Sequence, residues 1–248
     1  MARVALYALI LACPVSAAGA TLVLDSGRDN TLFQSAFGDI SNGAGEFLFA
    51  GHTGADTLRR ALIRFDFDPA RLPVDAIITG VTLRLHMSRT ISATEAVSLH
   101  RVTRSWGEGA SDAPLEEGGG TVAEPGDATW LHAFYPDEFW NNPGGDFDAA
   151  PLATALVVGN GYYDWTSTGL ADEVQSWRID PAANHGWMLI GNEELTATAK
   201  RFDSFQNAES AVRPVLIVTY VPEPGVSASF VVAWIAAGMR RSARFAAS

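Results

Sequence analysis

Residues 80–87 read Gly80-Val81-Thr82-Leu83-Arg84-Leu85-His86-Met87, and from Val81 onward apolar side chains occupy every second position. A period of two is the period of a β-strand that buries one face. The apolar set is expected to face the core, whereas Thr82, Arg84 and His86 are expected to face outward. Because one face is polar, the stretch predicts a half-buried antiparallel strand and therefore a β-rich fold.

Further strands are predicted on both sides of this stretch, with Gly, Pro, Asn and Asp clustered between them. Two of these strands are continuously apolar and are expected to lie in the middle of a sheet; they cover residues 186–190 and 215–220. The remaining predicted strands cover residues 21–24, 61–67 and 97–102. In the strand at 61–67, Arg64 and Asp66 are expected to face away from the apolar side.

One segment has helical spacing. Leu170, Val174 and Trp177 lie at i, i+4 and i+7, and residues 166–168 before them are Thr and Ser, which can cap a helix. We expect a helix of about two turns that ends near Asp180-Pro181. Many short strands with one short helix predict an all-β fold, a single β-sandwich or jelly roll. A Gly-rich acidic loop at residues 116–127 is expected to be solvated.

The N-terminus has the three parts of a secretory signal. Arg3 is followed by an apolar run at residues 4–13 and by the small-x-small sequence Ala18-Gly19-Ala20. We expect cleavage after Ala20, with Thr21 as the new N-terminus. Residues 10–13 also weakly match a lipoprotein acylation box, which is the alternative. Cleavage removes Cys13, the single cysteine, so the exported protein would contain no disulfide.

The C-terminus ends in a short motif, an apolar run and a basic cluster: residues 221–224, 225–239 and 240–244. An apolar run before arginines is typical of a membrane segment with its cations on the cytoplasmic side. As a helix the run would measure about 22 Å, less than the bilayer core of about 30 Å. The tail at 222–248 resembles the PEP-CTERM sorting signal, which implies recognition of Pro222, Glu223 and Pro224 by an exosortase-type enzyme and a transient stay in the inner membrane. The alternative is an apolar terminal peptide with no sorting role.

Charge narrows the range of partners. The chain has 17 basic and 28 acidic residues, a net charge of −11. Such a surface repels nucleic acid and anionic lipid, so nucleic acid is excluded as an expected partner. An acidic surface suits bound divalent cations, or solubility alone.

Residues 21–221 form one predicted domain with a recognisable series of motifs. They open with residues 29–33 and 59–66, continue with Ser105-Trp106-Gly107-Glu108-Gly109 and Trp130, and proceed through residues 144–148, 174–177, 184–187 and 202–206. This series resembles a DNRLRE domain, although residues 202–206 depart in part from its pattern. The family is similar to carbohydrate-binding module family 96. The resemblance implies a β-sandwich that binds polysaccharide, alginate in some members, often with a structural calcium ion.

Two loop clusters have the oxygen ligands that calcium prefers. One comprises Asp25, Asp29 and Asn30 near the first strand, and the other includes Asp146 and Asp148. The alternative is that these Asp and Asn residues only shape turns.

Candidate ligand-binding residues are aromatic or basic. Trp130, Trp140 and Tyr162 lie in polar surroundings and could stack on sugar rings, or they could anchor loops. Trp177 and Trp187 lie in apolar patterns and are expected in the core. The predicted outward arginines could form a cationic strip for a uronate, or could pair with Asp66 and Asp68 on solvated strand faces; they are Arg60, Arg64 and Arg84.

No nucleophile elbow, zinc-protease motif or phosphate-binding loop is present in the sequence. The expected function is therefore non-catalytic: an exported cell-surface or extracellular-matrix module that binds polysaccharide, with an acidic glycan such as alginate favoured. One alternative is a purely structural surface protein without a sugar site. Another is a polysaccharide lyase or hydrolase, for which Tyr162, Tyr163 and His132 are the candidates.

Overall fold

The alternating stretch forms the centre of the longest strand, β6 (Ile77–Thr90). Val81, Leu83, Leu85 and Met87 are buried, as the period of two predicts. The computed structural model describes residues 19–222, so residues 1–18 of the predicted signal and most of the predicted tail, including Glu223 and Pro224, lie outside the described residues. Within the described range the folded strands extend from Ala20 to Val221.

This part of the chain forms fifteen strands and one α-helix, so the prediction of an all-β fold is confirmed. Besides β6, the strands are β1 (Ala20–Leu24), β2 (Gly27–Phe33), β3 (Ile40–Ser41), β4 (Phe47–His52), β5 (Leu58–Phe65), β7 (Glu95–Arg101), β8 (Thr121–Val122), β9 (His132–Phe134), β10 (Glu138–Phe139), β11 (Ala153–Val157), β12 (Gly161–Thr166), β13 (Trp187–Ile190), β14 (Lys200–Asp203) and β15 (Val215–Val221). Three short 3-10 helices are η1 (Pro69–Arg71), η2 (Pro181–Ala183) and η3 (Ser210–Val212).

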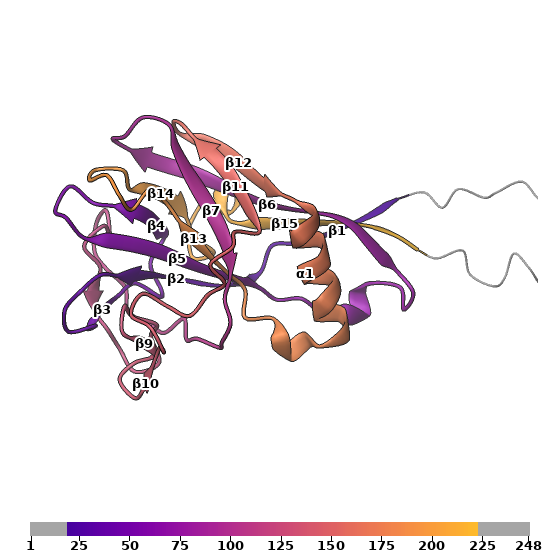
Figure 1. Ribbon diagram of the computed structural model, residues 1–248, viewed down its shortest axis with the longest axis horizontal. Coiled ribbons are helices and arrows are strands. Elements are labelled where there is room, and N and C mark those ends of the chain that lie inside the picture. Colours follow the sequence, from indigo (N-terminus) through magenta and orange to yellow (C-terminus); the bar gives the residue numbers. More distant parts are fainter. Residues whose placement is uncertain (1–18, 223–248) are drawn as a thin grey trace, which may run out of the picture.

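Eleven strands join into one antiparallel sheet that curls into a half-barrel (Figure 1). Its order is β1-β15-β6-β14-β4-β5-β13-β7-β11, while β12 pairs with β6 and β2 pairs with β5. The smaller pairs are β9 with β10 and β3 with β8. Because β1 pairs with β15, the two ends of the folded part lie side by side.

Strand β4 links the two halves of the curled sheet. Its residues from Phe47 to Ala50 pair with β14, whereas Gly51 and His52 pair with β5. Gly51 has φ +119°, and a Cβ at this position would lie 3.0 Å from the Ala199 Cα. A glycine is therefore required where the strand changes partners.

The main core lies inside the curl and combines aliphatic side chains with large aromatic ones, including Phe65, Trp165, Trp177, Trp187 and Phe202. Helix α1 (Thr168–Ile179) packs its apolar side against β6. Ser167 caps the helix by accepting a hydrogen bond from the Leu170 N–H. The predicted helix is confirmed, and with 12 residues it is longer than expected. No helix within residues 19–222 is long and apolar enough to cross a lipid bilayer.

A second core covers the opposite face of β2, β5 and β13. The long connection between β7 and β11, residues 102–152, folds over these strands and contributes Trp106, Trp130 and Trp140. Leu62 and Met188 point into this second core, while Ala61 and Ile63 point into the first. Strand β5 is therefore buried on both faces, which its alternating sequence did not predict.

The acidic loop at 116–127 is expected to be solvated, but two of its carboxylates are buried. Glu117 is buried and accepts hydrogen bonds from Asn42 Nδ2 and from the backbone N–H groups of Glu46 and Phe47. At the other end of the loop, the buried Asp127 accepts from the Glu124 N–H. Glu117 therefore attaches the loop to the body, whereas Asp127 stabilises a turn within the loop; both satisfy backbone donors that would otherwise be unpaired.

Candidate functional site

Two arginines lie directly opposite each other on neighbouring strands. Arg89 on β6 and Arg201 on β14 are register partners. Like charges in this arrangement repel, so the pair needs an anion between or beside the two guanidinium groups. Arg201 is also held in place, since its Nε donates to Ser88 Oγ at 3.1 Å and its guanidinium stacks over the Phe47 ring at 3.8 Å.

The anion present in the fold is the carboxylate of Glu116. Both Arg89 and Arg201 donate to its Oε2, each at 2.5 Å. Hydrogen bonding from Arg89, followed by its charge, lowers the pKa of Glu116 below the ordinary value. The Glu116 side chain is nevertheless 66% exposed, so this carboxylate sits at the surface and water screens its ion pairs.

A third arginine approaches from β5. Arg59 is buried, its guanidinium lies 4.7 Å from the centre of the Phe33 ring, and burial lowers its pKa to about 10. Its terminal nitrogens donate to Thr57 Oγ1 and to the carbonyl oxygens of Leu58 and Gly118, but its Nε has no hydrogen-bond partner among the described residues. The charge of Arg59 is thus fixed in position with one donor left over.

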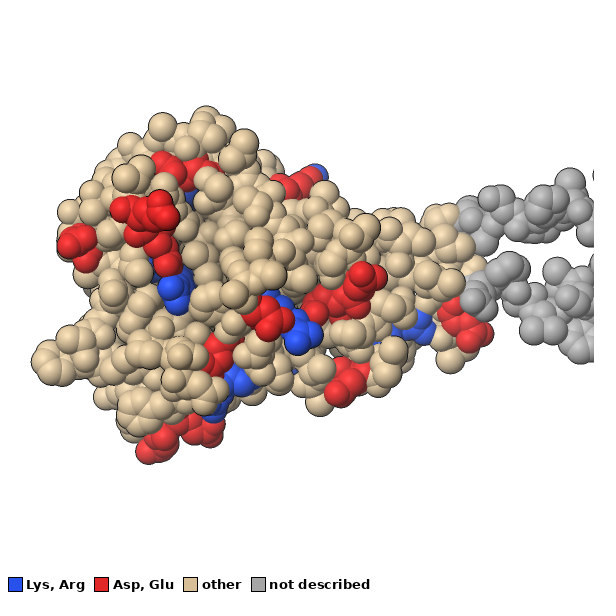
Figure 2. Space-filling model, in the orientation of Figure 1, with Lys and Arg blue, Asp and Glu red and all other residues tan. Residues whose placement is uncertain are grey.

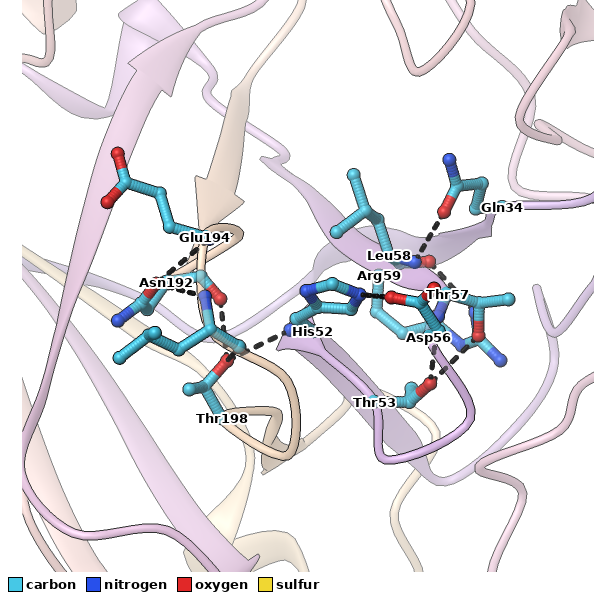
Figure 3. Close-up of polar contacts among 11 residues, drawn as sticks. Gln34, His52, Thr53, Asp56, Thr57, Leu58, Arg59, Asn192, Glu194 and Thr198 are labelled. Carbon is cyan, nitrogen blue, oxygen red and sulfur yellow. Dashed lines mark hydrogen bonds and ion pairs between the residues drawn. The ribbon is translucent and has the colours of Figure 1, made fainter.

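The tip of the β4–β5 hairpin holds Arg59 in this place (Figure 3). The hydroxyls of Thr53 and Thr57 are 2.8 Å apart across the turn, and His52 Nε2 lies 2.9 Å from Asp56 Oδ1. The Thr198 side chain accepts from the His52 N–H, which ties the hairpin to the loop before β14. Backbone pairing and side-chain contacts therefore fix the hairpin that positions Arg59.

These groups border a pocket of about 320 Å³, within the range of roughly 300–1,000 Å³ common for small-molecule sites. Four basic residues and one acidic residue line it, in a chain whose net charge is −11. Lys200 directs its Nζ to the Ala93 and Val158 carbonyl oxygens. The guanidinium groups are therefore the basic groups that a ligand in the pocket would contact. Apolar surface comes from Phe49 and Ile91. The lining residues are Phe49, Thr53, Gly54, Arg59, Arg89, Thr90, Ile91, Glu116, Gly118, Ala197, Ala199, Lys200 and Arg201.

The three arginines expected to form a strip do not lie together. Arg84 is on β6, where it forms an ion pair with Asp164 on the neighbouring β12. Arg60 is on β5, and its expected outward position is wrong, because the second core covers that face. Its guanidinium is instead paired with Glu193 and stacked on Trp130. Arg64, also on β5, is half-buried, and burial lowers its pKa. On the side of the molecule shown in Figure 2, acidic and basic side chains are interspersed and form no continuous basic strip.

Two of the three candidate stacking residues are inside the protein. Trp130 and Trp140 are only 7% and 5% exposed and belong to the second core. The Trp140 indole donates to the Thr129 carbonyl oxygen, as expected of a loop anchor. Tyr162 is 53% exposed, lies against His86 and donates to the Ala211 carbonyl oxygen. Trp177 and Trp187 are fully buried, so their assignment to the core is confirmed.

The predicted calcium clusters are dispersed or already satisfied. Asp146 accepts four hydrogen bonds from the backbone and side-chain amides of Asn141 and Asn142, whereas Asp148 forms an ion pair with Arg101. Residues 19–222 contain no group of three or more His, Cys, Asp or Glu side chains with metal-binding geometry.

Near the N-terminus the expected cluster also separates. Asp25 is exposed. Asn30 is fully buried, and its amide donates to Ser41 Oγ and to the Glu108 and Ala128 carbonyl oxygens, while its Oδ1 accepts from three groups. Asn30 is therefore a structural bridge with no free ligand oxygen. Asp29 is buried beside Glu108.

The residues considered for catalysis lie in separate places. His132 on β9 is buried against Tyr135 and Phe139. Tyr162 and Tyr163 belong to β12, which lies at the far side of the molecule from β9 in Figure 1. The Tyr163 hydroxyl is used within its own loop, where it donates to the Gly159 carbonyl oxygen. The three side chains therefore do not share one groove.

Sequence reasoning missed Arg89, Arg201 and Glu116 as a group. Arg89 follows the alternating stretch, Arg201 is the second residue of a short strand, and Glu116 lies in an irregular loop. No local pattern relates the three positions. The acidic character of the loop is visible in the sequence, but the arginines that it meets are brought together by strand pairing.

No protein-family model matches the chain, and no curated protein matches it significantly. The resemblance to DNRLRE domains therefore stays a prediction, and the function has to be argued from the chain's own residues.

Proposed function

We propose that this protein is an exported, non-catalytic module that binds a carboxylated polysaccharide in the pocket of Arg59, Arg89 and Arg201. The observation that carries the proposal is the convergence of Arg89 and Arg201 on one carboxylate oxygen at the rim of the pocket. Guanidinium groups recognise carboxylates through charge-assisted hydrogen bonds. A uronate carboxylate has the same chemistry as Glu116 and would take its place.

The rest of the pocket suits a sugar unit. Phe49 and Ile91 offer apolar surface to the C–H groups of a pyranose ring, and Arg59 adds positive charge to the pocket wall. The curled sheet is in keeping with a jelly-roll binding module, the finer fold that we infer from the sequence motifs. Alginate is the favoured ligand because each of its units carries a carboxylate. If no glycan binds, the result favours the alternative, a structural surface protein with no sugar site.

Replacing Arg89 or Arg201 by Gln is expected to weaken binding to alginate oligosaccharides about ten-fold or more, because each change removes a charge-assisted hydrogen bond worth roughly 1.5–3 kcal/mol. Isothermal titration at low ionic strength measures the loss, and added salt should weaken wild-type binding further. Arg89→Gln is the preferred variant, since the Arg89 side chain is mostly exposed and its replacement should disturb the fold least.

Two matched variants complete this test. Arg84→Gln alters another arginine of the same strand, one paired with Asp164 outside the pocket, and should bind as the wild type does. Glu116→Gln removes the internal carboxylate and should bind several-fold more tightly, because both arginines become free. Equal binding by Arg84→Gln and Arg89→Gln, or no retention of any acidic glycan, would reject the pocket as the glycan site.

Export and sorting form the second part of the proposal, supported by the sequences at 1–20 and 222–248. Mass spectrometry of the protein recovered from the producing cell is expected to give a chain that begins at Thr21 and ends close to Pro222–Pro224. An intact chain of 248 residues in the cytosol would contradict both processing steps.

A further inference from the structure

The described strands contain two places where arginines on neighbouring strands are register partners. One is the pair of Arg89 and Arg201, which shares the Glu116 carboxylate. The other is the pair of Arg28 on β2 and Arg64 on β5. Side chains at directly opposite positions extend from the same face of a sheet, with Cβ atoms about 4.5–5.5 Å apart. The second pair therefore places two positive charges side by side on one face.

No side chain of the described residues supplies the second pair with an anion. Neither Arg28 nor Arg64 forms an ion pair within residues 19–222. Burial, followed by the charge of Arg28, lowers the pKa of Arg64, and the opposite effect of Asp66 offsets this only in part. Like charges directly opposite each other destabilise a sheet, so this pair would gain from an added anion.

The other acidic side chain near the pair is already engaged. The charge of Arg28 acts on Glu108, but Glu108 Oε1 accepts hydrogen bonds from the Asp29 N–H and from Gln206 Nε2. Glu108 therefore serves the packing of its own loop and does not bridge the two arginines as Glu116 bridges the first pair.

The surroundings of Arg64 are positive although the chain as a whole is acidic. Burial, followed by the charges of Arg64 and Arg101, lowers the pKa of His185, while Asp180 acts in the opposite direction. The net charge of the chain is −11. A local positive potential on an acidic protein concentrates small anions at that place.

The pair is also accessible. Arg28 and Arg64 are both partly exposed. On the side of Arg64 away from Arg28, the neighbouring position is Gly186, because Trp187 pairs with Ile63. A Cβ on Gly186 would lie 2.7 Å from the Arg64 Cβ. Since no side chain fits there, Arg28 is the cross-strand neighbour that Arg64 faces, and the space beside it is open to a solute.

We propose that Arg28 and Arg64 together bind one tetrahedral oxyanion, a sulfate or phosphate group, on the face of β2 and β5 that they share. A guanidinium group pairs best with two oxygens side by side. A carboxylate has one such pair of oxygens and satisfies one arginine. A sulfate or phosphate group offers several pairs, so it can pair with both arginines at once.

This site is separate from the pocket proposed for the polysaccharide. Arg59 is the pocket residue on the same strand, but it lies five positions before Arg64. That spacing corresponds to about 16 Å along a strand and places the two side chains on opposite faces. The inference therefore goes beyond the proposed function and does not rest on it.

The test is a sulfate titration of the full chain, compared with sodium chloride at equal ionic strength. Calorimetry of the Arg89→Gln protein, in which the pocket is impaired, is expected to show saturable binding of one sulfate per chain. Arg28→Gln and Arg64→Gln, each added to that protein, should weaken this binding at least ten-fold. Arg84→Gln is the matched control, because Arg84 is paired with Asp164 and should not affect sulfate binding.

Melting temperature separates anion binding from a structural role of Arg28. In chloride, Arg28→Gln should melt at the wild-type temperature or above it, because the change removes repulsion between the two arginines. In sulfate, the wild type should gain more than the variant, since a bound anion stabilises the native state by mass action. Sulfate also stabilises proteins in general, so the difference between the two proteins is the measured quantity.

Two further ligands identify the source and class of the anion. Retention on sulfated dextran that Arg28→Gln abolishes would show that the group is carried by a polymer, whereas a response to free sulfate alone would indicate a small inorganic anion. Glucuronate should bind independently of Arg28. Equal responses of wild type and Arg28→Gln to sulfate, or glucuronate binding through Arg28 as tight as that of sulfate, would overturn the proposal. Alginate binding is measured through Arg89, so either result would leave the proposed function standing.

Discussion

Replacement of Trp187 by alanine is expected to lower the free energy of unfolding by about 3–5 kcal/mol, the range for removing a buried tryptophan. Trp187 is fully buried on β13, a strand paired on both sides. Its ring centre lies 5.0 Å from that of Trp177 on α1 and 6.4 Å from that of Phe65 on β5. Truncation would leave a cavity where the helix meets the sheet. Urea unfolding, with an unchanged slope against denaturant, measures the loss.

Trp187→Phe is the matched variant for this prediction. The indole Nε1 of Trp187 has no hydrogen-bond partner among the described residues, so phenylalanine removes no hydrogen bond and keeps much of the aromatic contact. Its effect should be clearly smaller than that of alanine. Equal losses for the two variants would mean that the packing around Trp187 differs from the structure.

Replacement of Asn30 by leucine is expected to destabilise the protein by about 3 kcal/mol, because several buried groups lose their partner at once. The Glu108 and Ala128 carbonyl oxygens and the Asn42 N–H all contact the Asn30 amide. For a domain of this size the change corresponds to a fall of roughly 10 °C in melting temperature. Thermal denaturation should be measured in chelator, so that any effect on cation binding is excluded.

Asn160→Leu provides the control for that measurement. Asn160 makes a hydrogen bond of comparable type, from its Nδ2 to the Ser88 carbonyl oxygen, but it lies at the surface. Water replaces a lost hydrogen bond at such a site, so the melting temperature should change little. A large loss at Asn160 and a small loss at Asn30 would contradict the bridging role assigned to Asn30.

Local patterns predicted the elements whose burial follows a simple period. The alternation at 80–87 correctly identified the buried face of β6, and the spacing of Leu170, Val174 and Trp177 correctly identified α1. The same reasoning was wrong at Arg60, because it treated β5 as a strand with one solvated face. Residues 102–152 return over that strand and bury it. A segment that lies so far along the chain can cover a strand without changing the spacing of apolar residues in that strand.

The candidate sites depended even more on distant contacts. From sequence, Asp29 is expected to share a calcium site with Asp25 and Asn30, whereas in the structure its contacts are with Glu108 and Phe205. Residues adjacent in sequence were assumed to cooperate, whereas in an extended strand successive side chains point to opposite faces. Asp29 and Asn30 therefore face different surroundings, and only one of them retains an unpaired oxygen.

By itself the amino-acid sequence determined that residues 19–222 are built mainly from antiparallel strands, with one helix, since side-chain period is a local property. It also determined the acidic character that makes a cluster of arginines notable. Only the tertiary structure decided that Arg89 and Arg201 would meet across β6 and β14, and that Glu116 would sit between them. The physical reason is that register between distant strands depends on the packing of the whole sheet, so no segment of the chain contains that information alone.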